Sequence, residues 1–210
     1  MTSLTSLLPI FITAMGFGLA VAAPVGPMSI LCMRRSLAEG WRPGLATGVG
    51  IATGDGIYAA VAALGLTGIS EFMLAYDRPL HLAAGLFLLY LGLKTFWRRP
   101  VENGTLPAPS VVSTFRAFWG SLLLTLTNPP TIIMFAAIFA ALAPKGGFEP
   151  ATALATVSGV TLGSLLWWIF IVGGVTVFRH ALGQRVRLWI DRLAGSFLVF
   201  FGVSEIRRGL

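Results

Sequence analysis

AGLFLLYLGLKTFWRR, at residues 84–99, returns near the end of the chain as AGSFLVFFGVSEIRR, at residues 194–208. Both stretches are apolar, carry glycine at the same two places and end on a pair of arginines. A second pair repeats in the same order, since GIATGDGIY at residues 50–58 corresponds to GVTLGSLLW at residues 159–167. The chain therefore contains one structural unit twice.

A third and weaker correspondence completes the repeated unit. GPMSI at residues 26–30 matches NPPTI at residues 128–132 by a proline and a Ser/Thr-Ile step. Each unit then holds three apolar segments, and an odd number of membrane crossings turns the second unit upside down relative to the first. Inverted repeats with interrupted helices build one site with two gates in many transporters. The repeat thus predicts a transport protein.

The composition is that of a membrane protein. Hydrophobic residues make up 56% of the 210 residues and charged residues 11%, whereas soluble domains carry about 25% charged residues. A helix crosses the hydrocarbon with about 20 residues and satisfies its own backbone there. We therefore predict an all-α membrane protein with six transmembrane helices as two inverted three-helix repeats. The predicted helices span about 7–32, 44–69, 79–97, 117–142, 151–177 and 189–206.

A single membrane transporter domain is expected to cover residues 1–210. Repeat one spans about 7–99 and repeat two about 117–208. Between them, a linker of about 100–116 is rich in proline and polar residues, as loops are. Three helices alone would leave their polar faces against lipid, which argues against two separate domains.

The basic residues predict the orientation of the chain. Most of the 15 Lys and Arg residues fall between the first and second, third and fourth, or fifth and sixth predicted helices. Positive charge is enriched in cytoplasmic loops, so both termini should face outward. The pair Arg207–Arg208 lies on the opposite side and does not fit this bias. Because the basic residues are divided among separate loops, the net charge of +7 reflects topology and no nucleic-acid partner is expected.

Asp55 is the only acidic or basic residue deep inside a predicted helix. A carboxylate at mid-membrane costs about 2.5–3.5 kcal/mol on insertion scales, and such residues are functional by default. No Lys or Arg inside a predicted helix can pair with it, so it either holds a proton or meets a cation. We predict that Asp55 is a proton-coupling or cation-binding residue. The structural alternative is a protonated carboxyl hydrogen-bonded to Thr53 or to a free carbonyl.

Prolines interrupt the first and fourth predicted helices at equivalent places. Pro24 and Pro27 flank Gly26 in the first, and Asn128 precedes Pro129 in the fourth. Each proline lacks an N–H and leaves the carbonyl four residues back without its helical donor. Paired interruptions of this kind point to a transporter site, although proline kinks also shape helix bundles without any site.

A new helix should begin after each interruption, with Ser29 or Thr131 in its first turn. Its free N–H groups attract an anion, and the freed carbonyls attract a cation. A zwitterion offers both charges, so the two interruptions together suit an amino acid.

Three further positions complete the predicted pathway. Tyr58 follows Asp55 by three residues and shares its helix face; Ser164 and Trp167 are their counterparts in the second repeat. The aromatic rings could line a pocket or simply pack. The predicted substrate-binding or pathway residues are Pro24, Gly26, Pro27, Ser29, Thr53, Tyr58, Asn128, Pro129, Thr131, Ser164 and Trp167.

Other residues exclude competing classes. Cys32 is the single cysteine, and a thiol redox carrier needs two. His81 and His180 have no second ligand nearby in sequence, so neither a metal site nor a cofactor is expected. Gly-x-x-x-Gly spacings at 44–48, 50–54 and 159–163 indicate close helix packing, and such faces could also join two copies as a homodimer.

These stretches resemble a known family. Residues 23–66, APVGPMSILCMRRSLAEGWRPGLATGVGIATGDGIYAAVAALGL, are similar to the N-terminal repeat of the lysine-exporter (LysE-type, RhtB-like) family of bacterial amino-acid exporters. LTNPPTIIMFAAIFA at 126–140 resembles the family's Asn-Pro segment, and YLGLKTFWRR at 90–99 the end of its third helix. The resemblance implies six spans in a bacterial inner membrane, no enzymatic activity, and export of amino acids or similar solutes driven by proton exchange. It carries over Pro24, Gly26, Pro27, Asp55, Asn128 and Pro129 as pathway residues.

The chain departs from the family pattern at two places. Pro-Val-Gly-Pro replaces the common Pro-Gly-Pro and precedes Met28, and Pro130 stands where a lysine often follows. Both changes bear on the choice of substrate. The hypothesis is amino-acid export with an amino acid, protons and the lipid bilayer as partners; the alternatives are a divalent metal-cation exporter of a related family and a non-transporting membrane scaffold.

Overall fold

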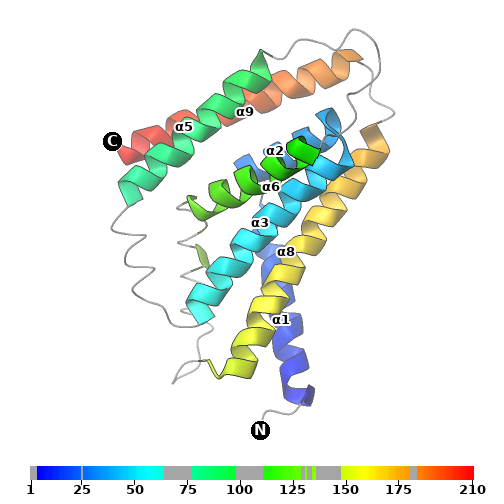
Figure 1. Ribbon diagram of the computed structural model, residues 1–210, viewed down its shortest axis with the longest axis vertical. Coiled ribbons are helices and arrows are strands. Elements are labelled where there is room, and N and C mark those ends of the chain that lie inside the picture. Colours follow the sequence, from blue (N-terminus) through cyan, green and yellow to red (C-terminus); the bar gives the residue numbers. More distant parts are fainter. Residues whose placement is uncertain are drawn as a thin grey trace.

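The computed structural model describes residues 4–24, 26–63, 77–97, 111–128, 131, 134–135, 148–179 and 184–210. In these ranges the chain forms helices and no strand (Figure 1), as the predicted all-α class requires. The seven described helices are α1 (Leu4–Ala22), α2 (Pro27–Ala38), α3 (Trp41–Ala63), α5 (Asp77–Phe96), α6 (Val111–Leu126), α8 (Pro150–Arg179) and α9 (Gln184–Gly209).

Three candidate membrane spans stand out among the described helices. Trp41–Ala63 and Pro150–Phe178 are each long and apolar enough to cross a bilayer. α1 and α2 make a third candidate together, as a pair bent by 81°. The apolar part of α5, His81–Phe96, is shorter.

The first predicted interruption lies where the prolines place it. α1 ends at Ala22 and α2 begins at Pro27, with Gly26 extended before it. Proline suits the first position of a helix because no N–H is needed there. The helix after the break runs on to Ala38, well past the end predicted at residue 32. Gly40 then turns the chain into α3 with a φ of 105°, which favours glycine.

The second interruption follows α6. This helix begins at Val111, before the start predicted at residue 117, and ends at Leu126. The N–H of Asn128 donates to the Thr125 carbonyl at 3.1 Å, a tight turn that ends the helix. Pro129, Pro130 and most of the second half of the predicted span 117–142 lie outside the described residues.

The other helix boundaries differ mainly at the charged ends. α3 begins at Trp41, and residues 64–69 of its predicted span are not described. α5 and α8 match their predicted ranges to within two residues at each end. α9 extends beyond 189–206 at both ends, because long charged side chains near a span end can reach water while the backbone stays helical.

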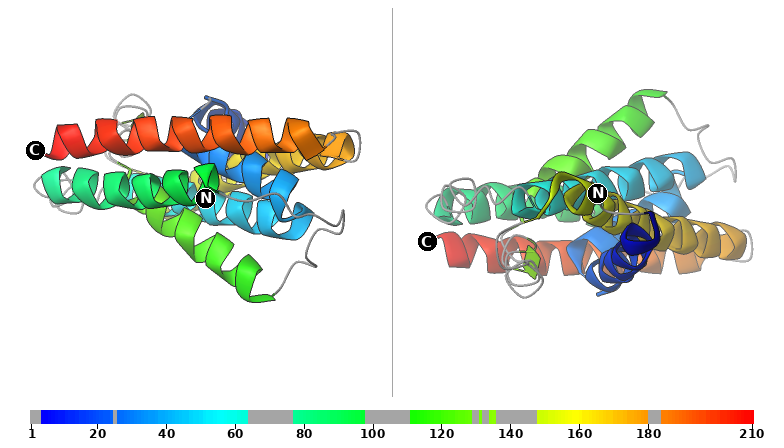
Figure 2. Two further views of the ribbon diagram at one scale, coloured as in Figure 1. Left: turned by 90° about the horizontal axis from the view of Figure 1, so that it is seen from above. Right: turned by 90° about the horizontal axis from the view of Figure 1, so that it is seen from below.

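α5 and α9 lie side by side and antiparallel, as the left view of Figure 2 shows. Their contact explains the glycines of the repeated stretch. A Cβ on Gly92 would lie 2.9 Å from the carbonyl oxygen of Gly195, and one on Gly85 would lie 2.8 Å from that of Gly202. The two backbones therefore touch where the repeat carries glycine, which is the close packing that small residues permit in membranes.

Glycines also join α3 to α6. A Cβ on Gly50 would lie 2.5 Å from the Phe118 carbonyl oxygen, and one on Gly54 would lie 2.6 Å from Cγ2 of Thr125. The equivalent glycines of the second repeat join α8 to α1. A Cβ on Gly159 would lie 2.6 Å from the Phe11 carbonyl oxygen.

Candidate functional site

Asp55 on α3 meets Ser164 on α8 in the interior. The Ser164 hydroxyl donates to Oδ2 of Asp55 at 2.6 Å. The two residues are 3% and 0% exposed. α3 and α8 pack against each other in opposite directions (Figure 1), which brings together two predicted site residues that are far apart in sequence.

Small side chains allow this approach. A Cβ on Gly56 would overlap the Thr161 side chain of α8, so only glycine leaves room for the facing helix. The Thr53 hydroxyl donates instead to the Val49 carbonyl of its own helix at 2.8 Å. The hydrogen bond to Asp55 therefore comes from Ser164 and not from Thr53, the donor that the sequence suggested. No described Lys, Arg or His forms an ion pair with Asp55.

Tyr58 connects the Asp55 helix to the second interruption. Its hydroxyl, buried with the ring, donates to the Leu126 carbonyl at 2.7 Å and lies 3.4 Å from that of Thr125. These are the carbonyls that Pro129 and Pro130 leave without a helical donor. A side chain from α3 thus satisfies backbone groups that a broken helix exposes.

The polar side chains beside that interruption bind each other. Nδ2 of Asn128 donates to Oγ1 of Thr131 at 2.8 Å, and the Thr131 N–H donates to the Asn128 carbonyl at 3.0 Å. Both side chains are half-buried. The structure brings these two predicted residues together, whereas Pro129 lies outside the described residues.

The first interruption is closed in a similar way. The buried Ser29 hydroxyl donates to the Pro24 carbonyl at 3.1 Å, across the extended turn at Gly26. Pro24 itself is exposed and Pro27 is half-buried. Trp167 packs against an apolar cluster that also contacts Met28, just after the break. The predicted aromatic pair therefore divides between the two interruptions.

The sequence did not reveal the role of Arg35. We expected Arg34 and Arg35 in the loop between the first two spans, but both lie inside α2 and are 7% and 8% exposed. Nη1 of Arg35 donates to Oγ1 of Thr47 and to the Ala117 carbonyl, each at 3.0 Å. It thereby links α2 to α3 and α6. The apolar run ends before these residues, so hydropathy gave no sign of their burial.

Two other buried ionic pairs join α2 to α9 and α5 to α9. Arg34 Nε lies 3.4 Å from Oδ1 of Asp191, which joins α2 to α9. His81 on α5 pairs with Glu205 on α9, and Arg208 lies 3.3 Å from the same carboxylate. Both pairs need partners from distant segments, which spacing along the chain does not show.

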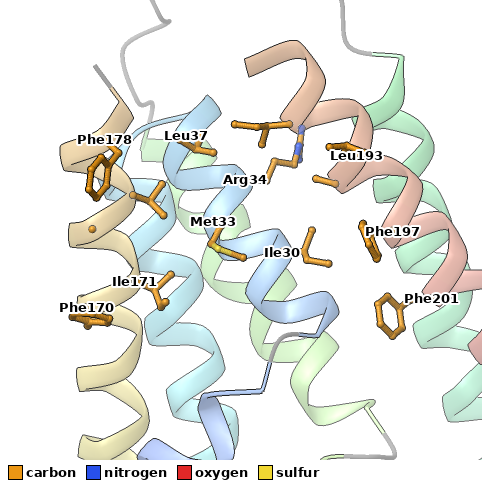
Figure 3. Close-up of a pocket in the computed structure, with 14 residues that line it drawn as sticks. Ile30, Met33, Arg34, Leu37, Phe170, Ile171, Phe178, Leu193, Phe197 and Phe201 are labelled. Carbon is orange, nitrogen blue, oxygen red and sulfur yellow. The ribbon is translucent and has the colours of Figure 1, made fainter. Parts of the chain in front are cut away.

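An apolar groove of about 630 Å³ lies between α2, α8 and α9 (Figure 3). Ile30 and Met33 line it from α2, Phe170 from α8 and Phe197 from α9. Arg34 extends across it toward α9, where Asp191 meets it. Asp55 does not line this groove, which is therefore separate from the site around the interruptions.

Known proteins resemble this chain over most of its length. A putative amino acid efflux protein, YcgF, of Bacillus subtilis is 27% identical over 92% of this chain and 93% of its own. A threonine efflux protein of Escherichia coli is 26% identical over 95% of this chain and 98% of its own. The chemotactic transduction protein ChpE of Pseudomonas aeruginosa is 33% identical over 77% of this chain and 79% of its own.

The family profile agrees with these relatives. The sequence model of the LysE type translocator family matches residues 19–209. The match includes both helix interruptions, Asp55 and Ser164. The chain belongs to the LysE type translocator family.

Proposed function

We propose that this protein exports amino acids or close analogues across the bacterial inner membrane, with Asp55 as the coupling residue. The observation that carries the proposal is the buried carboxylate held by Ser164 between α3 and α8. Tyr58, on the same helix, is bonded to the interrupted α6. Ionisable residues inside a membrane mark transport pathways, and interrupted helices form the sites of many secondary transporters. Relatives named as amino acid and threonine efflux proteins support the substrate class.

The proposal includes an architecture of six spans in two inverted repeats. Its support is the equivalence of contacts. α3 packs on α6, and its counterpart α8 packs on α1, through glycines at matching positions. α5 packs on its own counterpart α9 through glycines of the repeated stretch. Each helix pair thus joins one repeat to the other.

The proposed orientation puts both termini outside. The ends of α2, α5 and α8 and the starts of α3, α6 and α9 lie toward one end of the molecule, at the top of Figure 1. These helix ends, together with the segments that connect them, carry 11 of the 15 basic residues. Because such segments stay in the cytoplasm, this end would face inward.

The mechanism follows from the groups available at the site. Backbone N–H groups at the start of a helix after an interruption suit a carboxylate. An ammonium group suits an ionised Asp55 and the backbone carbonyls of the interrupted helices. Protonation of Asp55 would remove its charge and weaken its hold on a cation, so proton entry would favour release outside. Rocking of the two repeats around the site would then give alternating access.

Proteoliposomes loaded with a mixture of common amino acids test this proposal. With a proton gradient directed inward (acidic outside), the wild-type protein should release one or a few of these amino acids, identified by mass spectrometry. Asp55→Asn should lower that release at least about tenfold, equivalent to about 1.4 kcal/mol of barrier. Glu149→Gln is the control, because it removes an exposed carboxylate outside the helices. Undiminished release by a folded Asp55→Asn protein would refute the role of Asp55.

A further inference from the structure

We infer that Ser164 is the positioning residue of Asp55, and that the carboxylate can work from either of the two helices because the pair lies on the axis that relates the repeats. This inference rests on the proposed function and on the proposed inverted repeat. It adds a role for Ser164 and states why one carboxylate is enough for two half-pathways.

The sequence repeat makes the two residues equivalent. Gly54-Asp55 in GIATGDGIY corresponds to Gly163-Ser164 in GVTLGSLLW. The hydrogen bond of 2.6 Å thus joins a residue to its own counterpart. In an arrangement with two-fold symmetry, a residue meets its counterpart only at the axis. The Asp55–Ser164 pair therefore marks the axis between α3 and α8.

The contacts on one side of the pair have equivalents on the other. Gly56 lies against Thr161. Their counterparts, Leu165 and Ala52, lie together in one apolar cluster. A symmetric crossing predicts both pairings.

Contacts farther from the pair follow the same rule. A Cβ on Gly48 would lie 3.2 Å from Cγ of Trp168. The counterparts of these residues, Val157 and Ala59, share the other apolar cluster. A crossing of α3 and α8 that is symmetric about Asp55 and Ser164 predicts this shared membership of the two clusters.

The environments of the two positions are closely matched. Glycine precedes both Asp55 and Ser164 and lets a further helix approach, α6 in one repeat and α1 in the other. Exchanging the two side chains would preserve both the total volume and the Ser–Asp hydrogen bond. A carboxylate on the axis is also equally placed for an inward-facing and an outward-facing half-pathway.

The hydrogen bond from Ser164 makes the two carboxylate oxygens of Asp55 inequivalent. It donates to Oδ2, and no described residue donates to Oδ1. Oδ1 is then the oxygen available to a proton or a cation. A hydrogen bond to the charged form favours that form, so Ser164 would influence the pH at which Asp55 takes up a proton.

Few other charges act on this pair in the described chain. α1 has no acidic or basic residue, and α8 has none before Arg179. α6 contributes the exposed Arg116, and α2 the buried Arg34 and Arg35, which bind Asp191 and Thr47 respectively. On α3 itself, the Tyr58 hydroxyl is committed to the Leu126 carbonyl. Changes at Ser164 should therefore act on Asp55 directly.

The decisive experiment exchanges the two side chains, so that Ser occupies position 55 and Asp occupies position 164. The readout is the proteoliposome assay with the amino-acid mixture. Asp55→Ser alone should abolish release. The double variant Asp55→Ser/Ser164→Asp should release at least about tenfold more than Asp55→Ser, which a cycle of single and double variants measures. Gel filtration and thermal unfolding establish that each variant is folded.

The outcomes separate this inference from the proposed function. A folded but inactive double variant, beside an inactive Asp55→Ser, would overturn the inference and leave the proposed function standing. An active Asp55→Ser would overturn both. Ser164→Ala and Ser164→Thr provide a second test should the double variant not fold. Ser164→Ala should move the pH profile of release toward higher pH, and Ser164→Thr should keep the wild-type profile. Identical profiles for Ser164→Ala and the wild type would contradict the positioning role.

Discussion

At the scale of single residues, two polar side chains in the interior satisfy groups on a facing helix. Ser164 meets the carboxylate of Asp55, and Tyr58 meets the carbonyls of the broken α6. A buried carbonyl without a donor costs about 1–3 kcal/mol. The hydroxyl of Tyr58 therefore makes the interruption tolerable, and the interruption in turn explains a buried tyrosine hydroxyl.

Removing that hydroxyl should destabilise the protein. Tyr58→Phe keeps the ring packed on Phe135 but leaves the Leu126 carbonyl without its donor. We expect a loss of about 1 kcal/mol in stability, seen as a lower unfolding temperature, together with slower release of amino acids. Tyr90→Phe is the matched control, since Tyr90 is 58% exposed. Equal unfolding temperatures for the two variants would contradict the role of Tyr58.

At the scale of helices, glycine sets how closely the backbones approach. The α5–α9 contact involves two glycines of α5 and three of α9. In lipid, no hydrophobic force drives helices together, so van der Waals contact between close backbones is a main source of association. The glycines that recur in the stretches 84–99 and 194–208 therefore serve helix packing and are not part of the site.

A large side chain at this contact should separate the two helices. At Gly92, even a Cβ would lie 2.7 Å from the N of Val199, a backbone atom that cannot move alone. Gly92→Leu should cost about 1–3 kcal/mol or more, as overpacking does. Gly173→Leu is the control, because a Cβ there has nothing within 4 Å. Thermal unfolding in detergent compares them, and a stable Gly92→Leu would show that the contact is not needed.

At the scale of the whole molecule, the charges and the helix ends predict one orientation in the bilayer. Arg42 is exposed at the start of α3, toward the end of the molecule that we assign to the cytoplasm. Leu210 is 84% exposed at the end of the chain and should face outward. Cys32 is the single cysteine of the chain and is fully buried. Its replacement by Ala removes the one natural thiol that could react with a label.

Thiol labelling of intact cells tests this orientation. In a Cys32→Ala background, Leu210→Cys and Glu149→Cys should react with a membrane-impermeant maleimide, because both positions are expected outside. Arg42→Cys should react only after the membrane is permeabilised. The reverse pattern would invert the topology and place the C-terminal arginine pair in the cytoplasm.

The sequence by itself determined the features that depend on local chemistry. Hydropathy identified the helical class, and proline geometry located the break between α1 and α2 to within a few residues. A single acid in an uncharged run marked Asp55 as a residue needing an explanation. The repeat further indicated that Asp55 and Ser164 are equivalent, although not that they touch.

Only the tertiary structure decided which helices face one another, and with them the partners of the polar groups. Ser164 for Asp55, Leu126 for Tyr58 and Thr47 for Arg35 each come from a different helix. Hydropathy cannot choose among apolar helices of similar length, since all of them are equally compatible with lipid. The choice depends on where bare glycine backbone permits close approach, and that is a property of two surfaces together.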